Sequence, residues 1–379
     1  MKRARVVIVQ EAVLQYREQF YGLLREKLAE QGVELVVIHS NPLPEENVSK
    51  DAIDLPRAIR VRKLGLRVGS RRLVWQRAHA HLRGSDLVIV EQANKHLLNY
   101  LLAAEQLVGC RRFALWGHGR NFQAGDLDRP AAWLKARLSR RPHWWFAYTT
   151  QSADVVAKTG FPRERITVVQ NAFDTRELAK QIAELDAESA HRLWQEWDLG
   201  EAQIGLYIGG LFPEKRLDFV FAAADSIRAT NENFVFVIAG GGTERPYVEH
   251  FARSRSWVRY VGPRFGEEKA ALLSRADVLL MPARAGLVVL DAFTAEVPIA
   301  ISASQPHPPE ASYIRHEGNG LVVQDGGSAR RYGEAVAELL RDESRRRVIA
   351  EGCRVARERY TVEEMADRFA AGVLSALAR

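Results

Sequence analysis

The sequence predicts an α/β fold made of two doubly wound parallel-sheet domains. Short apolar runs rich in β-branched residues alternate with helical patterns, which is typical of strands joined by crossover helices. The alternation pauses at a charged helical stretch near residues 176–200 and then begins again. The length of 379 residues agrees with two domains, because a single hydrophobic core rarely grows that large.

The first half opens with a strand–helix–strand unit. RVVIVQ at residues 5–10 is followed by a helical pattern that ends at Gly32, and then by VELVVIHS. Four more strand candidates follow, at residues 86–91, 111–118, 144–150 and 165–172. We therefore expect residues 1–175 to form a first Rossmann-like domain.

The second half repeats this pattern. Its strand candidates lie at residues 203–210, 233–242, 257–263, 276–283 and 297–302, again separated by helical segments. Residues 176–359 are expected to form the second domain. Ligands of parallel sheets bind beyond the carboxyl ends of the strands, so a cleft between the two domains is the predicted site.

The charge of the chain favours an anionic partner. The formal net charge is +7, and the stretch at residues 57–83 carries nine Lys and Arg residues interleaved with leucines and Trp75. A solvated basic face beside a strand is the ordinary interpretation of such a stretch. A patch that contacts a membrane surface is the alternative.

The remaining bulk features favour a cytoplasmic protein. Cys110 and Cys353 are far apart and lack metal-binding spacing, which favours reduced thiols. The apolar run at residues 6–9 is too short for a signal peptide, and no run of about 18 apolar residues predicts a membrane span. No RRM, KH or helix-turn-helix signature supports nucleic-acid binding.

The sequence lacks the motifs that are typical of several enzyme classes. No glycine follows the first strand before Gly22, so the dinucleotide-binding fingerprint is missing. The cluster IAGGGTER has Arg245 where a third glycine would stand, and tight turning after a strand is the commoner meaning of such a cluster. P-loop, HExxH and GxSxG motifs are also missing.

Two strand-end loops of the second half have features of an anion site. One places Gly209 and Gly210 after a strand, with Lys215 and Arg216 just before a helix, where cations can neutralise phosphate oxygens. The other places Gly286, Leu287 and Val288 at a helix start, where unpaired N–H groups attract an anion, and puts Asp291 within reach of a ribose. Two ordinary strand-to-helix turns remain the alternative interpretation.

These stretches resemble the family 4 type of retaining glycosyltransferases, which have the GT-B fold of two Rossmann-like domains facing a central cleft. The resemblance covers almost the whole chain and keeps the family's order of motifs. In the first half it is similar to bacterial members that build cell-surface polysaccharides. The matching segments are ITVVQNAFDT, YIGGLFPEKRLDFVFAAA, FVIAGGG, VRYVGP, MPARAGLVVLDAFTAEVPIAIS and PPEASYIRHEGNGLVV.

The resemblance implies roles for individual residues. Lys215 matches the lysine that holds the donor diphosphate, and Asp291 stands where a glutamate usually binds the ribose. Residues 286–288 match the backbone that receives the phosphates or the sugar. His118 in WGHGRN matches a first-domain histidine near the transferred sugar. The closing helix at 360–379 is implied to pack on the first domain, and no metal or other cofactor is implied.

Two departures from the family pattern stand out. The arginine usual at the end of the first donor-domain strand is replaced by Gly210, and we hypothesise that Arg216, Arg264 or Arg284 replaces its charge. The first of the family's paired carboxylates is replaced by Ala283. Ala283→Glu should change donor preference or rate if this position faces the sugar.

The resemblance leaves two functions open. One is an active retaining transferase that uses a nucleotide sugar and a glycan or lipid-linked acceptor in polysaccharide or lipopolysaccharide assembly. The other is a catalytically silent subunit that binds a sugar nucleotide. The retained Lys215, Asp291 and His118 favour activity, whereas Gly210 and Ala283 favour the silent subunit.

Overall fold

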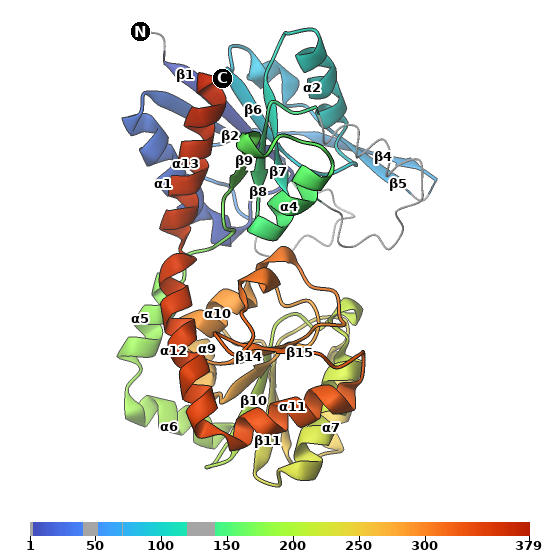
Figure 1. Ribbon diagram of the computed structural model, residues 1–379, viewed down its shortest axis with the longest axis vertical. Coiled ribbons are helices and arrows are strands. Elements are labelled where there is room, and N and C mark those ends of the chain that lie inside the picture. Colours follow the sequence, from blue (N-terminus) through green and yellow to red (C-terminus); the bar gives the residue numbers. More distant parts are fainter. Residues whose placement is uncertain (1–2, 41–51, 70, 120–140) are drawn as a thin grey trace. The chain divides into compact units, whose positions relative to one another are not determined.

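The computed structural model describes residues 3–40, 52–69, 71–119 and 141–379. The chain divides into two compact units (Figure 1). Unit 1 contains residues up to 174 together with 361–379, and unit 2 contains residues 175–360. No helix of the described chain has the length and apolar character needed to cross a membrane.

Unit 1 is built on a seven-stranded parallel sheet. Its strand order is β3-β2-β1-β6-β7-β8-β9, so the direction of winding reverses between β1 and β6. A reversal of this kind leaves a crevice at the carboxyl ends of the two strands concerned. The strands are β1 (Ala4–Gln10), β2 (Val33–Ser40), β3 (Ile59–Val61), β6 (Leu87–Glu91), β7 (Phe113–Gly117), β8 (Trp144–Ala147) and β9 (Ile166–Val168).

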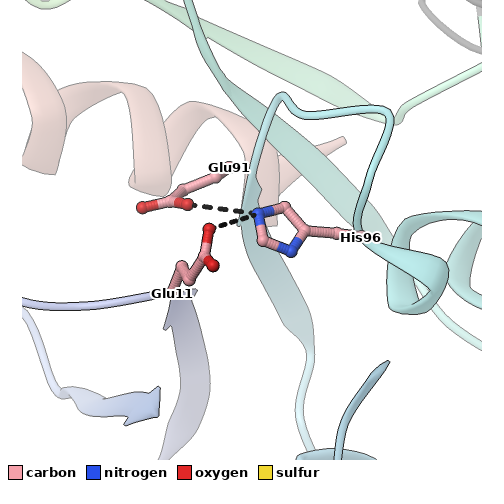
Figure 2. A group of neighbouring side chains, drawn as sticks. All are labelled: Glu11, Glu91 and His96. Atoms are coloured by element: carbon pink, nitrogen blue, oxygen red, sulfur yellow. Dashed lines mark ion pairs between the residues drawn. The ribbon is translucent and has the colours of Figure 1, made fainter. Parts of the chain in front are cut away.

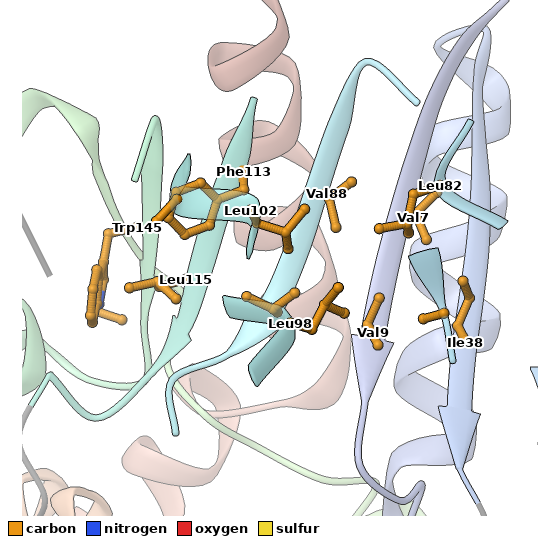
Figure 3. Packing of buried hydrophobic residues seen from close by; sticks show 14 of the residues in the cluster. Val7, Val9, Ile38, Leu82, Val88, Leu98, Leu102, Phe113, Leu115 and Trp145 are labelled. Atoms are coloured by element: carbon orange, nitrogen blue, oxygen red, sulfur yellow. The ribbon is translucent and has the colours of Figure 1, made fainter. Parts of the chain in front are cut away.

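The core of unit 1 lies between this sheet and its helices. Apolar side chains from β1, β6, β7 and β8 pack against those of α2 on one face (Figure 3). Trp144 and Trp145 of β8 are both buried. The described helices of unit 1 are α1 (Glu18–Glu30), α2 (Leu97–Leu107), α4 (Thr150–Lys158) and α13 (Val362–Ala378), with short 3-10 turns η1 (Gln15–Arg17), η2 (His79–Leu82) and η3 (Arg163–Arg165).

The closing helix α13 belongs to unit 1. Thr361 caps its start by accepting a hydrogen bond from the Glu364 amide, at 3.1 Å. The ring of Phe369 stacks on Phe146 of β8 with centroids 4.2 Å apart. A Cβ on Gly372 would lie 2.4 Å from the Thr167 hydroxyl, so only glycine permits this close approach to β9.

The basic stretch keeps Arg60, Arg62, Arg67 and Arg77 exposed, as a solvated basic face requires, and it also forms strands that the sequence did not reveal. It supplies the edge strand β3 and an antiparallel hairpin of β4 (Lys63–Val68) and β5 (Arg71–Gln76). The leucines and Trp75 alternate with other residues at a period of two, which is the strand pattern. The many arginines hid this pattern in the sequence.

Unit 2 is built on a six-stranded parallel sheet of order β12-β11-β10-β13-β14-β15. Its winding reverses between β10 and β13. The strand β15 was not among the predicted strands. The strands are β10 (Gln203–Ile208), β11 (Phe234–Ala239), β12 (Val258–Gly262), β13 (Val278–Leu280), β14 (Ile299–Ser302) and β15 (Leu321–Val323).

Helices cover both faces of this sheet, and a glycine cluster allows the loops at its edge to pack closely. A Cβ on Gly240 would lie 1.9 Å from the Gly209 carbonyl oxygen, and one on Gly242 would lie 2.2 Å from that of Leu211. The cluster therefore serves backbone packing. The helices are α5 (Arg176–Glu184), α6 (Ala187–Glu196), α7 (Leu217–Thr230), α8 (Arg245–Arg253), α9 (Gly266–Arg275), α10 (Val288–Thr294), α11 (Ala329–Arg341) and α12 (Glu343–Arg359), with 3-10 turns η4 (Pro213–Lys215) and η5 (Pro309–Tyr313).

Candidate functional site

The winding reversal of unit 2 brings two predicted residues together. Lys215 ends the η4 turn after β10, and Arg284 lies in the loop after β13. The Lys215 ammonium donates a hydrogen bond to the Arg284 carbonyl oxygen, at 3.0 Å. The loops on either side of the reversal point are thus joined where parallel sheets bind their ligands.

Lys215 holds a poorly compensated positive charge. Burial lowers the pKa of Lys215, Glu214 opposes this effect, and Arg284 lowers the pKa further. A lowered lysine pKa means that the folded protein disfavours the cation at this place. An anion bound here would relieve that cost, so the position suits a phosphate.

The loop after β13 is also tied to the loop after β14. The Arg284 amide donates to the Pro306 carbonyl at 3.0 Å, while Arg284 itself has a left-handed φ of 53°. The Ala285 amide donates to Nδ1 of His307 at 3.2 Å, and His307 Nε2 lies 2.9 Å from the Ser302 carbonyl. His307 can satisfy both partners only as the neutral tautomer with its proton on Nε2.

The surroundings of His307 favour that neutral form. Burial lowers the pKa of His307, the Ser302 carbonyl opposes the shift, and Arg284 and Lys215 lower it further. The sequence did not reveal His307 as a site residue, because a lone histidine between prolines carries no motif. Only the adjacency of β13 and β14 shows that it supports the Arg284 loop.

Three consecutive backbone amides at the start of α10 donate no hydrogen bond to another described residue. The Val289 amide donates to the Gly286 carbonyl at 3.0 Å, and helix bonding continues from there. Within the described residues, no hydrogen bond is donated by the amides of Gly286, Leu287 or Val288. These N–H groups remain available to an anion next to Lys215 and Arg284.

Asp291 has a partner that the sequence did not reveal. Its carboxylate lies 2.7 Å from the Lys269 ammonium of α9. Burial raises the pKa of Asp291, and Lys269 opposes the shift. The ion pair holds the Asp291 side chain one turn into α10. The contact between Asp291 and a ribose stays a prediction.

The three arginines considered as replacements for the missing cation differ in their environment. Arg216 pairs with Asp218 at 2.9 Å, and Arg264 pairs with Glu268 at 2.6 Å. Arg284 makes no ion pair with any described carboxylate, and its buried Nε has no hydrogen-bond partner there. Of the three, Arg284 is therefore the one whose positive charge is not already paired with a described carboxylate, and it is the best placed to attract an anion.

The two departures from the family pattern are close-packed positions. A Cβ on Gly210 would lie 2.6 Å from the Phe212 ring, so a side chain at this position requires that ring to move. Gly209 before it has φ 151°, which side chains rarely adopt. Ala283 is only 1% exposed, so a glutamate there would need room that the present packing does not leave.

His118 lies at the carboxyl edge of the unit 1 sheet, directly after β7. Its half-buried ring meets the Tyr148 ring edge-on, with centroids 4.3 Å apart. The following Gly119 has φ 74°, and a Cβ there would lie 2.7 Å from Val156. The chain thus needs glycine next to His118.

A second group of polar side chains lies where the unit 1 sheet reverses. Glu11 follows β1, Glu91 ends β6, and His96 precedes α2. Figure 2 shows both carboxylates next to the imidazole, with Nε2 of His96 at 3.6 Å from Glu11 and 3.4 Å from Glu91. These three residues are spaced closely enough to hold a metal ion.

Two ammonium groups compete for that position. Lys63 lies 3.1 Å from one Glu11 oxygen, and Lys95 pairs with the other. Burial raises the pKa of Glu11, but the neighbouring Lys95, His96 and Lys63 lower it to about 2. A cation at this site would have to displace Lys95, so the cluster is better described as an ion network.

Comparison with known proteins agrees with this architecture. Residues 195–355 match the family of "Glycosyl transferases group 1", and residues 18–177 match "Glycosyltransferase Family 4". The two matches leave only the chain ends and a short junction uncovered. The chain belongs to glycosyltransferase family 4.

Two curated relatives are named as transferases of different sugars. A GDP-mannose-dependent alpha-(1-6)-phosphatidylinositol monomannoside mannosyltransferase of Mycobacterium tuberculosis is 34% identical over 49% of this chain and 50% of its own. An alpha-D-kanosaminyltransferase of Streptomyces kanamyceticus is 23% identical over 79% of this chain and 77% of its own. The chain thus spans about half the length of the mycobacterial relative.

Solved structures share the fold over nearly the whole chain. The Anabaena protein HepE, crystallised with UDP, superposes with a TM-score of 0.70 at 13% identity and covers 98% of this chain and 100% of its own. WaaG, a glycosyltransferase involved in lipopolysaccharide biosynthesis, has a TM-score of 0.64 at 17% identity, over 96% and 98% of the two chains. The fold of this family member is GT-B, as the sequence predicted.

Proposed function

We propose that the protein is a glycosyltransferase that moves a sugar from a nucleotide-sugar donor to a glycan or lipid-linked acceptor. The Lys215–Arg284 contact carries this proposal, because it places a cation beside three open amides at the reversal point of unit 2. The family membership and a relative that uses GDP-mannose support a sugar nucleotide as the anion. The sugar and the base of the nucleotide are not assigned.

We further propose a retaining, metal-independent, hexosyltransferase-like reaction. The chemical task is to stabilise the negative charge that develops on the departing diphosphate. Lys215, Arg284 and the amides of Gly286, Leu287 and Val288 are suited to this task, since fixed N–H groups and cations act without reorganisation. His118 and Asp291 are proposed to contact the sugar and the ribose.

The biological setting proposed is polysaccharide or lipopolysaccharide assembly by a cytoplasmic enzyme on the inner face of a membrane. The basic stretch at residues 57–83 supports a membrane partner. A structural neighbour involved in lipopolysaccharide biosynthesis points to the same setting by analogy of fold. Nucleic acid is not proposed as a partner.

A silent sugar-nucleotide-binding subunit is the second candidate, because Gly210 and Ala283 depart from the family pattern. The two are separated by incubating the protein with a panel of nucleotide sugars and measuring thermal stabilisation and nucleotide release. We expect one donor to stabilise the protein and to be turned over once an acceptor is present. Stabilisation without turnover across plausible acceptors indicates the silent subunit, and no stabilisation by any donor contradicts both.

A further inference from the structure

The β4–β5 hairpin of unit 1 turns an apolar face to solvent. Its register pairs Leu64 with Trp75 and Leu66 with Leu73, so these four side chains share one face. Leu64 is 52% exposed and Leu66 is 59% exposed. An antiparallel hairpin usually does the reverse, with its apolar face on the core and its polar face in water.

The opposite face of the hairpin is anchored to the sheet. The Gln76 side-chain amide donates to the Gln10 carbonyl and to the Ser40 hydroxyl, both at 2.8 Å. Lys63 pairs with Glu11 at 3.1 Å, and the Val74 amide donates to the Lys95 carbonyl at 2.7 Å. In Figure 1, β4 and β5 extend from unit 1 as an arm. The exposure of the leucines therefore belongs to a fixed element.

The charged residues that flank this apolar face along the hairpin are cations. Arg62 just before β4 and Arg77 just after β5 are exposed and, by the alternation of the strands, lie on the side of Leu64, whereas the exposed Arg67 lies on the opposite face. The sequence from 57 to 83 contains no Asp or Glu. An apolar face whose own strands carry cations and no acidic residue matches a surface that offers anionic headgroups above an apolar layer.

We propose that the apolar face of the β4–β5 hairpin docks on a bilayer containing anionic lipids, with Leu64 and Leu66 entering the boundary between headgroups and acyl chains and the arginines contacting phosphates. A second copy of the chain fits less well, because pairing two such faces would bring their cationic rims together. This inference deepens the proposed location at a membrane. It does not depend on sugar transfer.

Vesicle sedimentation of the full chain tests the proposal. The probe is vesicles of phosphatidylcholine with about 30% phosphatidylglycerol, compared with pure phosphatidylcholine, at low and high salt. The wild type should bind the anionic vesicles, and salt should weaken binding. The double change Leu64→Ser/Leu66→Ser should lower vesicle affinity about tenfold while leaving the melting temperature unchanged, because both side chains are already exposed.

A matched control makes the same kind of change at two comparably exposed apolar residues elsewhere. Val348 and Val355 on α12 are 62% and 58% exposed, so Val348→Ser/Val355→Ser should leave vesicle binding unchanged. Equal losses in both double variants would overturn the assignment of the hairpin but keep a membrane location. No wild-type binding at low salt, or a leucine-dependent dimer in light scattering, would overturn the proposal itself. Donor stabilisation, measured without vesicles, reports separately on the proposed transferase.

Discussion

The two sheets reverse their winding in the same way but carry opposite chemistry at the reversal point. In unit 2 the site contains Lys215, Arg284 and open amides, with no carboxylate paired to either cation among the described residues. In unit 1 the equivalent site contains Glu11 and Glu91, whose charges are met by Lys63, Lys95 and His96. One fold thus supports an anion-receptive edge and an internally neutralised edge.

The difference teaches that the side chains after the strands, and not the sheet, decide what an edge can bind. A cation that lacks a carboxylate partner keeps its attraction for a phosphate. A cation that is already paired with a carboxylate attracts a phosphate only weakly, and its role is structural.

The largest expected effect concerns the neutralised edge. Glu11→Gln removes the carboxylate that lies 3.1 Å from the Lys63 ammonium, whose side chain is 2% exposed. Breaking a buried pair typically costs about 3–5 kcal/mol, so the free energy of unfolding in urea should fall by that order. Nucleoside diphosphate binding should not change. Glu34→Gln is the control, because the Arg5–Glu34 pair is exposed and should contribute less than about 1 kcal/mol.

The pH dependence of the free energy of unfolding should report on the same carboxylate. The pKa of Glu11 is about 2 in the folded chain against an ordinary value of 4.5. A lowered carboxyl pKa adds stability above pH 4.5, and that stability is lost as the pH falls toward 2. The Glu11→Gln variant should therefore lose less stability than the wild type over this range. Parallel curves would contradict the ion network.

The anion-receptive edge should respond next. Lys215→Met removes the buried cation, and a hydrogen bond to a charged group contributes about 1.5–3 kcal/mol, so nucleoside diphosphate affinity should fall about 10- to 100-fold. Lys95→Met, the matched change in unit 1, should leave that affinity unchanged. Calorimetric titration with UDP and GDP measures both. An equal loss in the two variants would remove the proposed contrast.

The arginines offer a finer test of the same idea. Arg284→Gln should weaken diphosphate binding about tenfold, because Arg284 has no described carboxylate partner. Arg216→Gln and Arg264→Gln should change it less than about threefold, since Asp218 and Glu268 already hold those charges. Glutamine keeps an unbranched polar side chain at the left-handed Arg284. A larger loss at Arg264 would assign the missing family cation to that residue.

Much of the fold was predictable because strands buried in parallel sheets read as continuous apolar runs. The β4–β5 hairpin was not, since its leucines stand among glycine, lysine and arginine residues and two arginines follow its turn. The edge strands β3 and β15, three residues each, carry too few positions to show a period. The central strands were all predicted, and so were the edge strands β9 and β12.

The candidate site was predictable where a residue adjoins a strand end. Lys215, Arg284 and the amides at residues 286–288 follow β10 and β13, and both loops could be located in the sequence. Partners such as Lys269 and His307 could not be found, because they reach the site from α9 and from the loop after β14. Their contacts depend on strand order, which the sequence does not display.

The smallest expected effect on diphosphate affinity tests whether His307 supports the anion-receptive edge. His307→Ala leaves the Ala285 amide and the Ser302 carbonyl without partners, so it should cost about 1–3 kcal/mol of stability and a few-fold in diphosphate affinity. His316→Ala is the control, because this exposed imidazole also accepts an amide hydrogen bond, from Val322. It should have little effect on either measurement.

Lowering the pH should show whether His307 contributes stability through its hydrogen bonds or only through packing. Burial lowers the pKa of His307 below its ordinary 6.5, so the stability that the neutral ring contributes is present above pH 6.5 and is lost as the pH falls below it. Protonation also takes away the lone pair on Nδ1 that accepts from Ala285. The stability gap between wild type and His307→Ala, followed by urea unfolding, should therefore narrow in acid. A gap that stays constant from pH 8 to about pH 5 would mean that the ring only fills space behind the Arg284 loop.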